Sequence, residues 1–262
     1  SVKKIENNEF CECSSLTQIT IPSSVTKIGD NAFCRCISLS NITIPSFVTS
    51  IGRNAFIGCS KLTQISLPSS LTEIGCYAFC ECTSLIKIEI PSSVIRIDGC
   101  AFKGCSSLIQ IKNHSQISII EFNLFNLCSS LSEITIPDSV TKIGNFSFCG
   151  CSSLSEIEIP PSVIEIGENA FKNCSSLKNV SIPSSVTKMG PFIFCGCSSL
   201  QGISLSNSIN EIKLFSFYGC KSLKQIKIPN SLTKIGNFCF GNCTSLKEII
   251  IPSSLLIIKY SC

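Results

Sequence analysis

Phenylalanine recurs every 23 residues along this chain of 262 residues, from Phe10 and Phe33 to Phe240 without a gap. Cysteine keeps the same period three places after each of these phenylalanines, from Cys13 to Cys243, and leucine follows three places later. Eleven copies of one unit therefore make up nearly the whole sequence. A fixed period of about 20 to 50 residues is typical of stacked-repeat proteins, in which each unit contacts only its neighbours.

Each unit is predicted to contain a strand, a turn and a second, shorter extended segment. Apolar and polar residues alternate at positions 42–44, as in a strand with one buried face. Pro45 ends this strand because proline has no N–H to continue a ladder. Gly52 permits a tight change of direction, and Asn54 is predicted to cap a short helical turn.

One unit cannot be stable alone. It directs about seven apolar side chains inward, each contributing roughly 1.5–3 kcal/mol on burial, whereas ordering each residue costs about 1.5 kcal/mol. Stacking supplies the remainder by covering both flanks of a unit and by pairing its strand with the next. Since every unit runs the same way, the strands must be parallel, and residues 1–262 are expected to form a single domain.

The repeated pattern Cys-x-x-Leu-x-x-Ile-x-Ile-Pro-x-x-Val-x-x-Ile-Gly-x-x-Ala-Phe-x-x-Cys resembles the BspA-like leucine-rich repeat, the class also named after a treponemal leucine-rich-repeat protein. Residues 82–91, 140–144 and 167–174 match it closely. The resemblance covers the chain and implies a right-handed, curved solenoid of about 11 coils. The Leu-x-x-Ile-x-Ile strands would form the main parallel sheet, accompanied by short second strands and short helical turns.

The resemblance also implies a function. Members of this family occur on oral and gut bacteria and on anaerobic parasitic protists. They are associated with cell-surface adhesion, with binding of host matrix proteins such as fibronectin, and with aggregation between cells. We therefore expect a non-enzymatic surface or secreted adhesion module that recognises a host or matrix protein or glycoprotein. The family has no catalytic residues to transfer to this sequence.

Composition argues against several other classes. The net charge of +4 is spread along the chain, which does not support a nucleic-acid interface. No apolar run reaches the roughly 18 residues of a spanning helix, so direct membrane insertion of this segment is not expected. The sequence lacks a glycine-rich phosphate loop, a histidine cluster and a carboxylate pair placed for acid–base chemistry. We expect no enzyme activity, cofactor or metal.

A cytoplasmic scaffold for protein–protein interaction is the alternative. Abundant thiols and the lack of a signal peptide pattern favour it. The sequence opens part-way through a repeat, because residues 1–5 match residues 24–28. It is therefore interpreted as a fragment of a longer protein or as a naturally truncated array. Apolar ends without a polar capping unit also predict end-to-end self-association.

Twenty cysteines are present, and eleven of them follow the 23-residue period. These ladder cysteines are predicted to be buried free thiols that pack as small apolar side chains. Five more come directly after one of the periodic phenylalanines: Cys11, Cys34, Cys80, Cys149 and Cys195. With the ladder cysteines they create Cys-x-Cys pairs, so a zinc site is an alternative. A disulfide between Cys76 and Cys100 is a further alternative, and Cys262 is expected to be an exposed terminal thiol.

The outward positions of the main strands are the candidate ligand-binding face. They are neutral in the first three coils, acidic in the middle and mixed towards the end. The candidate residues are Lys87, Glu89, Lys112, Glu133, Glu156, Glu158, Lys224 and Lys227. Because this face has no aromatic residue, it also fits a solvated sheet surface that only discourages aggregation. Weak contacts repeated over many coils would still build avidity.

Two units depart from the pattern. In one, Asn113-His114 replaces Ile-Pro and Glu121 replaces the glycine. In the other, Ser206 replaces the proline, Lys213 the glycine, and an aromatic run occupies residues 215–218. Both departures are interpreted as sequence drift in a tolerant repeat. The alternative is that a functional site depends on the local irregularity. His114 has no acid or nucleophile placed for triad chemistry and is interpreted as a surface turn residue.

Six Asn-x-Ser/Thr sequons are candidates for glycosylation in a secreting eukaryote. They begin at Asn41, Asn113, Asn145, Asn173, Asn179 and Asn242. Asparagine and serine are common throughout the repeat, so the sequons also fit chance. A glycan on Asn41 or Asn179 would obstruct the strand face.

Overall fold

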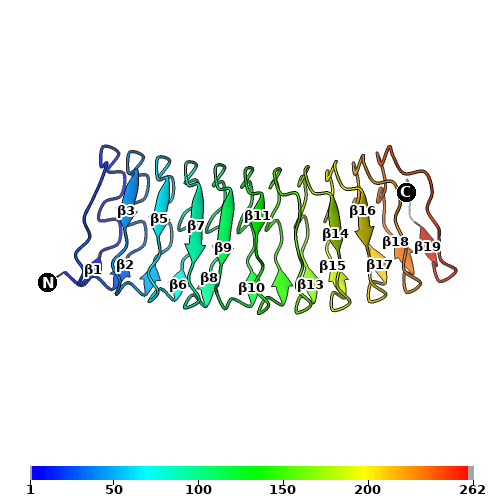
Figure 1. Ribbon diagram of the computed structural model, residues 1–262, viewed down its shortest axis with the longest axis horizontal. Helices are drawn as coiled ribbons and strands as arrows, with labels where there is room; N and C mark the ends of the chain where they lie inside the picture. Colours follow the sequence, from blue (N-terminus) through cyan, green and yellow to red (C-terminus); the bar gives the residue numbers. More distant parts are fainter. Residues whose placement is uncertain (1, 259–262) are drawn as a thin grey trace.

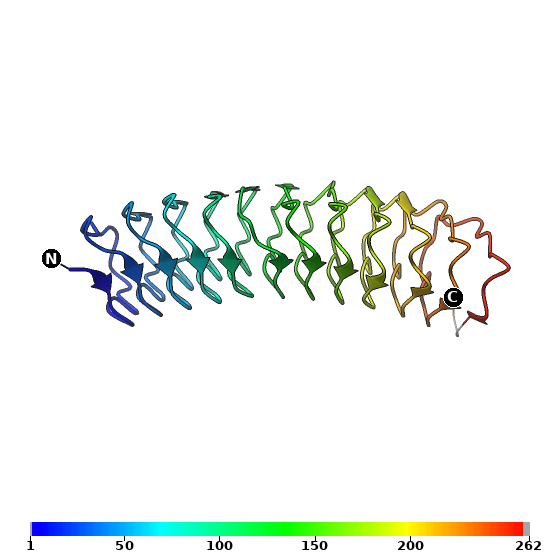
Figure 2. The ribbon, with the colours of Figure 1, turned by 90° about the horizontal axis from the view of Figure 1, so that it is seen from below.

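The computed structural model describes residues 2–258, which wind into one elongated stack of coils that bends only slightly (Figures 1 and 2). Each coil is one repeat, because residues paired between neighbouring coils are 23 positions apart, as in Lys4 with Lys27 and Asn41 with Gln64. The first strand, β1, and the last, β19, lie at opposite ends of the stack. The predicted repeat solenoid of about 11 coils, with parallel sheets, is confirmed.

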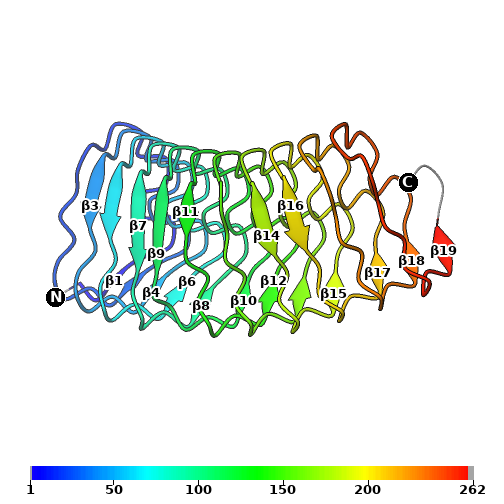
Figure 3. The ribbon, with the colours of Figure 1, turned by 45° about the vertical axis from the view of Figure 1, so that its right-hand side comes forward.

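The Leu-x-x-Ile-x-Ile segments form a row of parallel strands along one side of the stack, here called the main row (Figure 3). Its first sheet comprises β3 (Asn41–Thr43), β5 (Gln64–Ser66), β7 (Lys87–Ile90), β9 (Gln110–Asn113) and β11 (Glu133–Ile134). Further along, β14 (Asn179–Ser181) pairs with β16 (Gly202–Ser204). Isolated bridges at Glu156, Lys227 and Ile250 continue the row.

A second row of two-residue strands runs parallel to the first. Its strands are β1 (Lys4–Ile5), β2 (Lys27–Ile28), β4 (Ser50–Ile51), β6 (Glu73–Ile74), β8 (Arg96–Ile97), β10 (Ile119–Ile120), β12 (Lys142–Ile143), β13 (Glu165–Ile166), β15 (Lys188–Met189), β17 (Glu211–Ile212), β18 (Lys234–Ile235) and β19 (Ile257–Ile258). Pairing in this row stops between β8 and β10 and again between β15 and β17.

Both interruptions fall at the two units that lack the proline and the glycine. β10 and β17 are followed by Glu121 and Lys213, where regular units have glycine. A Cβ built on Gly144 would lie 2.7 Å from a carbonyl oxygen of the preceding coil, so a side chain here forces coils apart. Asp98 also replaces the glycine, yet its unit keeps Pro91 and its N–H still reaches the preceding coil at 2.9 Å. Loss of the glycine alone therefore does not end the pairing.

The expected helical turn is wrong, since residues 2–258 contain no helix. Asn54 and Gly58 have left-handed backbone angles, with φ of 55° and 70°, and these break any helical run. The N–H groups of Asn54, Phe56 and Gly58 donate to carbonyl groups of the next coil at 2.7–2.9 Å. Those of Ala55 and Ile57 close tight turns within the coil. The segment is thus a third line of hydrogen bonds between coils.

The periodic phenylalanines form a stacked spine through the core. Centroids of neighbouring spine rings lie 5.2–5.8 Å apart. The nine rings from Phe33 to Phe217 are fully buried. Each stacked pair contributes about 0.5–1.5 kcal/mol beyond the burial of its apolar area.

The ladder cysteines are bound to this spine. Each described ladder thiol from Cys36 to Cys243 donates to the carbonyl oxygen of the spine phenylalanine in the preceding coil, at 3.1–3.3 Å. Cysteine is thus both a small apolar side chain and a donor. Burial raises the pKa of the Cys128 thiol from 9.0 to about 12. Burial likewise raises the pKa of Cys151 and Cys174 well above the usual range.

Two alternatives were considered for the other cysteines, a disulfide and a zinc site, and the described residues form neither. Cys76 and Cys100 both have free thiols, so the disulfide between them is not formed. The Cys76 thiol donates to the carbonyl oxygen of Gly99 at 3.0 Å instead. Within residues 2–258, no three His, Cys, Asp or Glu side chains gather as a metal site. Cys262 lies outside the described residues.

The raised thiol pKa values predict alkaline instability. The stabilising effect of a neutral buried thiol is complete below pH 9.0 and is lost as the pH rises towards about 12 for Cys128. We expect the free energy of unfolding to fall by about 1.4 kcal/mol per pH unit for each such thiol. Urea unfolding in reducing buffer between pH 8 and 10.5 measures the slope. Cys128→Ala should make it shallower, whereas Ser14→Ala, which removes no titratable group at an exposed site, should leave it unchanged. An identical slope in both variants would contradict this account.

Candidate binding face

The outward side chains of the main row form the candidate binding face. The eight residues selected from the sequence are all exposed: Lys87, Glu89, Lys112, Glu133, Glu156, Glu158, Lys224 and Lys227. Strand alternation explains this, since Ile88 and Ile111 between them point into the core. The residues nevertheless do not gather into a single cluster.

The candidate binding face includes β7 and β9, the two longest strands of the described chain. Lys87 is in register with Gln110, and Glu89 with Lys112. At the end of β9, His114 occupies the place of the usual proline, and its N–H donates to a carbonyl oxygen of the preceding coil at 3.0 Å. A residue with an N–H thus extends the ladder where proline would stop it.

A shallow depression of about 490 Å³ lies over these strands. It brings together three of the selected residues, Lys87, Glu89 and Lys112, with the polar side chains of Gln64 and Gln110. Apolar atoms of neighbouring strand residues also line it. The depression therefore combines two ammonium groups, one carboxylate and two amides on a rigid sheet.

Contacts at the rim leave the lysines available. Glu89 Oε1 lies 3.7 Å from His114 Nε2, which is an ion pair when the imidazole is protonated. Gln110 Nε2 donates to Glu133 Oε2 at 2.8 Å. Among residues 2–258, no carboxylate lies within ion-pair distance of Lys87 or Lys112. Such exposed pairs contribute about 1 kcal/mol or less, so a ligand can displace them at low cost.

The remaining candidates are spread along the stack. Main-row pairing is interrupted between Glu133 and Glu156, two acidic side chains at equivalent positions of neighbouring coils. Like charges directly opposite each other are unfavourable. Glu158 is exposed in the same coil. Lys227 lines a separate depression of about 540 Å³, and Lys224 is not among its lining residues.

His114 was missed as a candidate. The sequence placed it in a surface turn, and it is exposed. Its contact with Glu89 comes from stacking, because the two residues are 25 positions apart and meet only across neighbouring coils. The replacement of the repeat proline was the one available signal, and it did not reveal the partner.

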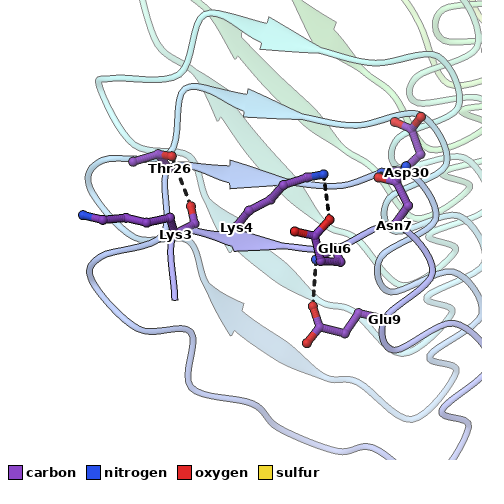
Figure 4. Close-up of polar contacts among 7 residues, drawn as sticks. All are labelled: Lys3, Lys4, Glu6, Asn7, Glu9, Thr26 and Asp30. Atoms are coloured by element: carbon purple, nitrogen blue, oxygen red, sulfur yellow. Dashed lines mark hydrogen bonds and ion pairs between the residues drawn. The ribbon is translucent and has the colours of Figure 1, made fainter. Parts of the chain in front are cut away.

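Several charged side chains of the second row form ion pairs with one another. Lys142 Nζ lies 2.8 Å from Glu165, and Lys234 Nζ lies 2.7 Å from Glu211. In the first coils, shown in Figure 4, the Asp30 N–H donates to Asn7 Oδ1 of the preceding coil at 2.9 Å. These side chains link coil to coil, which leaves fewer free charges than on the main row.

Comparison with known proteins identifies the repeat. Residues 3–131, 72–201, 118–225 and 164–262 match the family described as BspA type leucine rich repeat region (6 copies). The chain belongs to this family. No curated protein matches the sequence.

Solved structures of bacterial proteins share the solenoid fold of this chain. A leucine-rich repeat protein from Bacteroides ovatus is 31% identical, with a TM-score of 0.85 over 99% of this chain and 78% of that chain. A leucine rich cell surface protein from Faecalibacterium prausnitzii is also 31% identical, with a TM-score of 0.63 over 100% of this chain and 83% of that chain. The pneumococcal vaccine antigen PcpA is 22% identical with a TM-score of 0.57, which shows likeness of fold alone.

The asparagines of the six sequons differ in exposure. Five of the six asparagines are exposed, among them Asn41 and Asn179 on the main row. Asn113 is buried, and its Oδ1 accepts from the N–H and hydroxyl of Ser115. This burial is incompatible with a glycan in the folded chain.

No helix suited to crossing a membrane occurs in residues 2–258.

The irregular unit predicts the effect of restoring the repeat at residues 113 and 114. Asn113 Nδ2 is buried and has no partner among the described residues, but Asn113 Oδ1 accepts from the N–H and hydroxyl of buried Ser115. The His114 N–H also donates to the carbonyl oxygen of Ile90. Replacing Asn113 and His114 by the usual Ile and Pro should lower the free energy of unfolding by about 1–3 kcal/mol, because Ser115 loses its acceptor and Ile90 loses its donor. Chemical denaturation measures the change, and a rise in the free energy of unfolding would refute this interpretation.

Proposed function

We propose that this chain is a non-enzymatic adhesion module, at the cell surface or secreted, which binds a host or matrix protein or glycoprotein through its main row. The observation that carries the proposal is the depression over β7 and β9, where Lys87 and Lys112 have no acidic partner among residues 2–258. Family membership supports a binding module, and the F. prausnitzii relative is described as a cell surface protein.

Charge along the face gives the ligand an orientation. Acidic groups of the ligand would meet Lys87 and Lys112, while basic groups would meet Glu133, Glu156 and Glu158 further along the stack. Complementary potentials of this kind mainly raise the association rate and make binding sensitive to salt. The face has no aromatic anchor, so affinity would come from several modest contacts made together.

An intracellular protein–protein interaction scaffold is the second candidate. The observation that favours it is chemical: the ladder cysteines from Cys36 to Cys220 are free thiols, which is the usual state in a reducing compartment. Biotinylation of intact cells that express the full-length protein separates the two locations. Labelling from outside supports the adhesion module, and labelling only after lysis supports the scaffold.

Self-association is a further part of the proposal. Ile250 and Leu256, in the last described coil, are 74% and 80% exposed. Two copies stacked end to end would cover this apolar surface and continue the parallel rows. Sedimentation velocity of the chain over a concentration series would detect the dimer.

A ligand assay tests the main row. We expect immobilised fibronectin to bind the chain, and Lys87→Gln with Lys112→Gln to weaken binding about tenfold, a loss typical of residues at the centre of an interface. The matched control changes Lys27 and Lys61 to Gln, because both are exposed lysines away from the depression. Surface plasmon resonance at two salt concentrations provides the readout. Equal weakening by both double variants, or no binding to the original chain, would oppose the proposal.

A further inference from the structure

Four units in the second half of the chain place phenylalanine where the backbone is left-handed. Two positions before the spine ring, five of the eleven units have asparagine, a residue that tolerates positive φ: Asn8, Asn31, Asn54, Asn123 and Asn169. Phe146, Phe192, Phe215 and Phe238 occupy the same position with φ of 54–57°. A bulky side chain in this region strains the backbone.

Three of these phenylalanines follow one another and make a second line of rings, separate from the spine. The centroids of Phe192 and Phe215 are 5.0 Å apart, and those of Phe215 and Phe238 are 4.9 Å apart. Tyr218 meets Phe215 edge to face at 5.3 Å. We call Phe192, Phe215, Tyr218 and Phe238 the aromatic edge; it belongs to the yellow and orange coils of Figure 3.

Packing of the core does not account for the aromatic edge. Tyr218 and Phe238 are 37% and 39% exposed, and the adjoining Leu214 is 39% exposed. The spine rings already fill the interior beside them. Strained backbone combined with exposed aromatic side chains is characteristic of a site used for contact with another molecule. Tyrosine and other large aromatics are also the side chains that anchor interfaces.

Two lysines lie beside the aromatic edge. Lys172 Nζ lies 5.4 Å from the centroid of the Phe192 ring, and Lys213 is exposed next to Leu214. Of the nearby carboxylates, Glu211 pairs with Lys234, whereas Glu168 accepts from the neutral side-chain amide of Asn169 at 2.9 Å and keeps its negative charge. Among residues 2–258, neither Lys172 nor Lys213 has an acidic partner.

We propose that the aromatic edge is a docking surface for an acidic peptide segment that carries apolar anchor side chains. The stacked rings cover one another's faces and leave their edges outward. Ring edges carry partial positive charge, so they favour carboxylates as well as apolar contact. Lys172 and Lys213 add full positive charge at the rim. This surface lies on the turns between the second row and the spine, and it is independent of the main row.

Peptide binding tests the proposal on the chain of 262 residues. The probe is a fluorescein-labelled peptide that alternates aspartate and phenylalanine. Comparison peptides replace the aspartates by lysine or the phenylalanines by serine. We expect fluorescence anisotropy to show that the chain binds the first peptide with about tenfold or more higher affinity than either comparison peptide. Removing one hot-spot contact typically costs this much affinity. No binding, or equal binding of the lysine peptide, would overturn the proposal.

Matched variants locate the binding. Phe215→Asn should weaken it about tenfold or more. Phe146→Asn should leave it unchanged, because Phe146 has the same backbone angle but lies between units that carry Asn123 and Asn169. Both asparagines suit the left-handed backbone, and thermal unfolding checks that each variant is folded. Should Phe215→Asn fail to fold, Lys172→Gln with Lys213→Gln carries the test. Equal loss in the two phenylalanine variants, or a dimer of the chain that Phe215→Asn abolishes, would refute an acidic peptide as the occupant.

Discussion

Stacking in register is the constraint on which the rest of this protein depends. Residues 23 positions apart pair across two rows of parallel strands, and a line of turns adds further hydrogen bonds between coils. The phenylalanine rings stack at 5.2–5.8 Å inside these coils. Each coil satisfies the backbone groups and covers the apolar flank of the next. The ladder thiols fit this arrangement, because a small side chain with one donor can reach the carbonyl of the preceding coil without separating the rings.

The candidate sites lie where units depart from the repeat. Replacing proline by His114 supplies an N–H that lengthens β9 and places an imidazole beside Glu89, at the rim of the depression. The same units interrupt the second row, where Glu121 and Lys213 replace glycine. Phenylalanine in place of asparagine creates the aromatic edge. A regular scaffold thus tolerates local irregularity, since each change is confined to neighbouring coils.

Much of the fold was predictable from the sequence, and the candidate sites were only partly so. Periodicity located the spine, the strands and the buried thiols. It failed at the turn beginning with Asn54, because asparagine suits both a helix cap and a left-handed residue, and only contacts with the next coil distinguish them. The disulfide between Cys76 and Cys100 was considered from equal offsets, yet both thiols are free. The aromatic edge was noticed only as an irregular run at residues 215–218.

By itself, the sequence determined the period, the inward and outward side chains of each strand, and the parallel direction of every pair, because identical units running one way admit no other pairing. The tertiary structure decided which side chains of different coils meet. Lys87, Glu89 and Lys112 share a depression, while Lys224 and Lys227 lie elsewhere. The physical reason is that alternation specifies a face, whereas the lateral shift and spacing of coils, set by glycine, proline and left-handed turns, specify the neighbours on it.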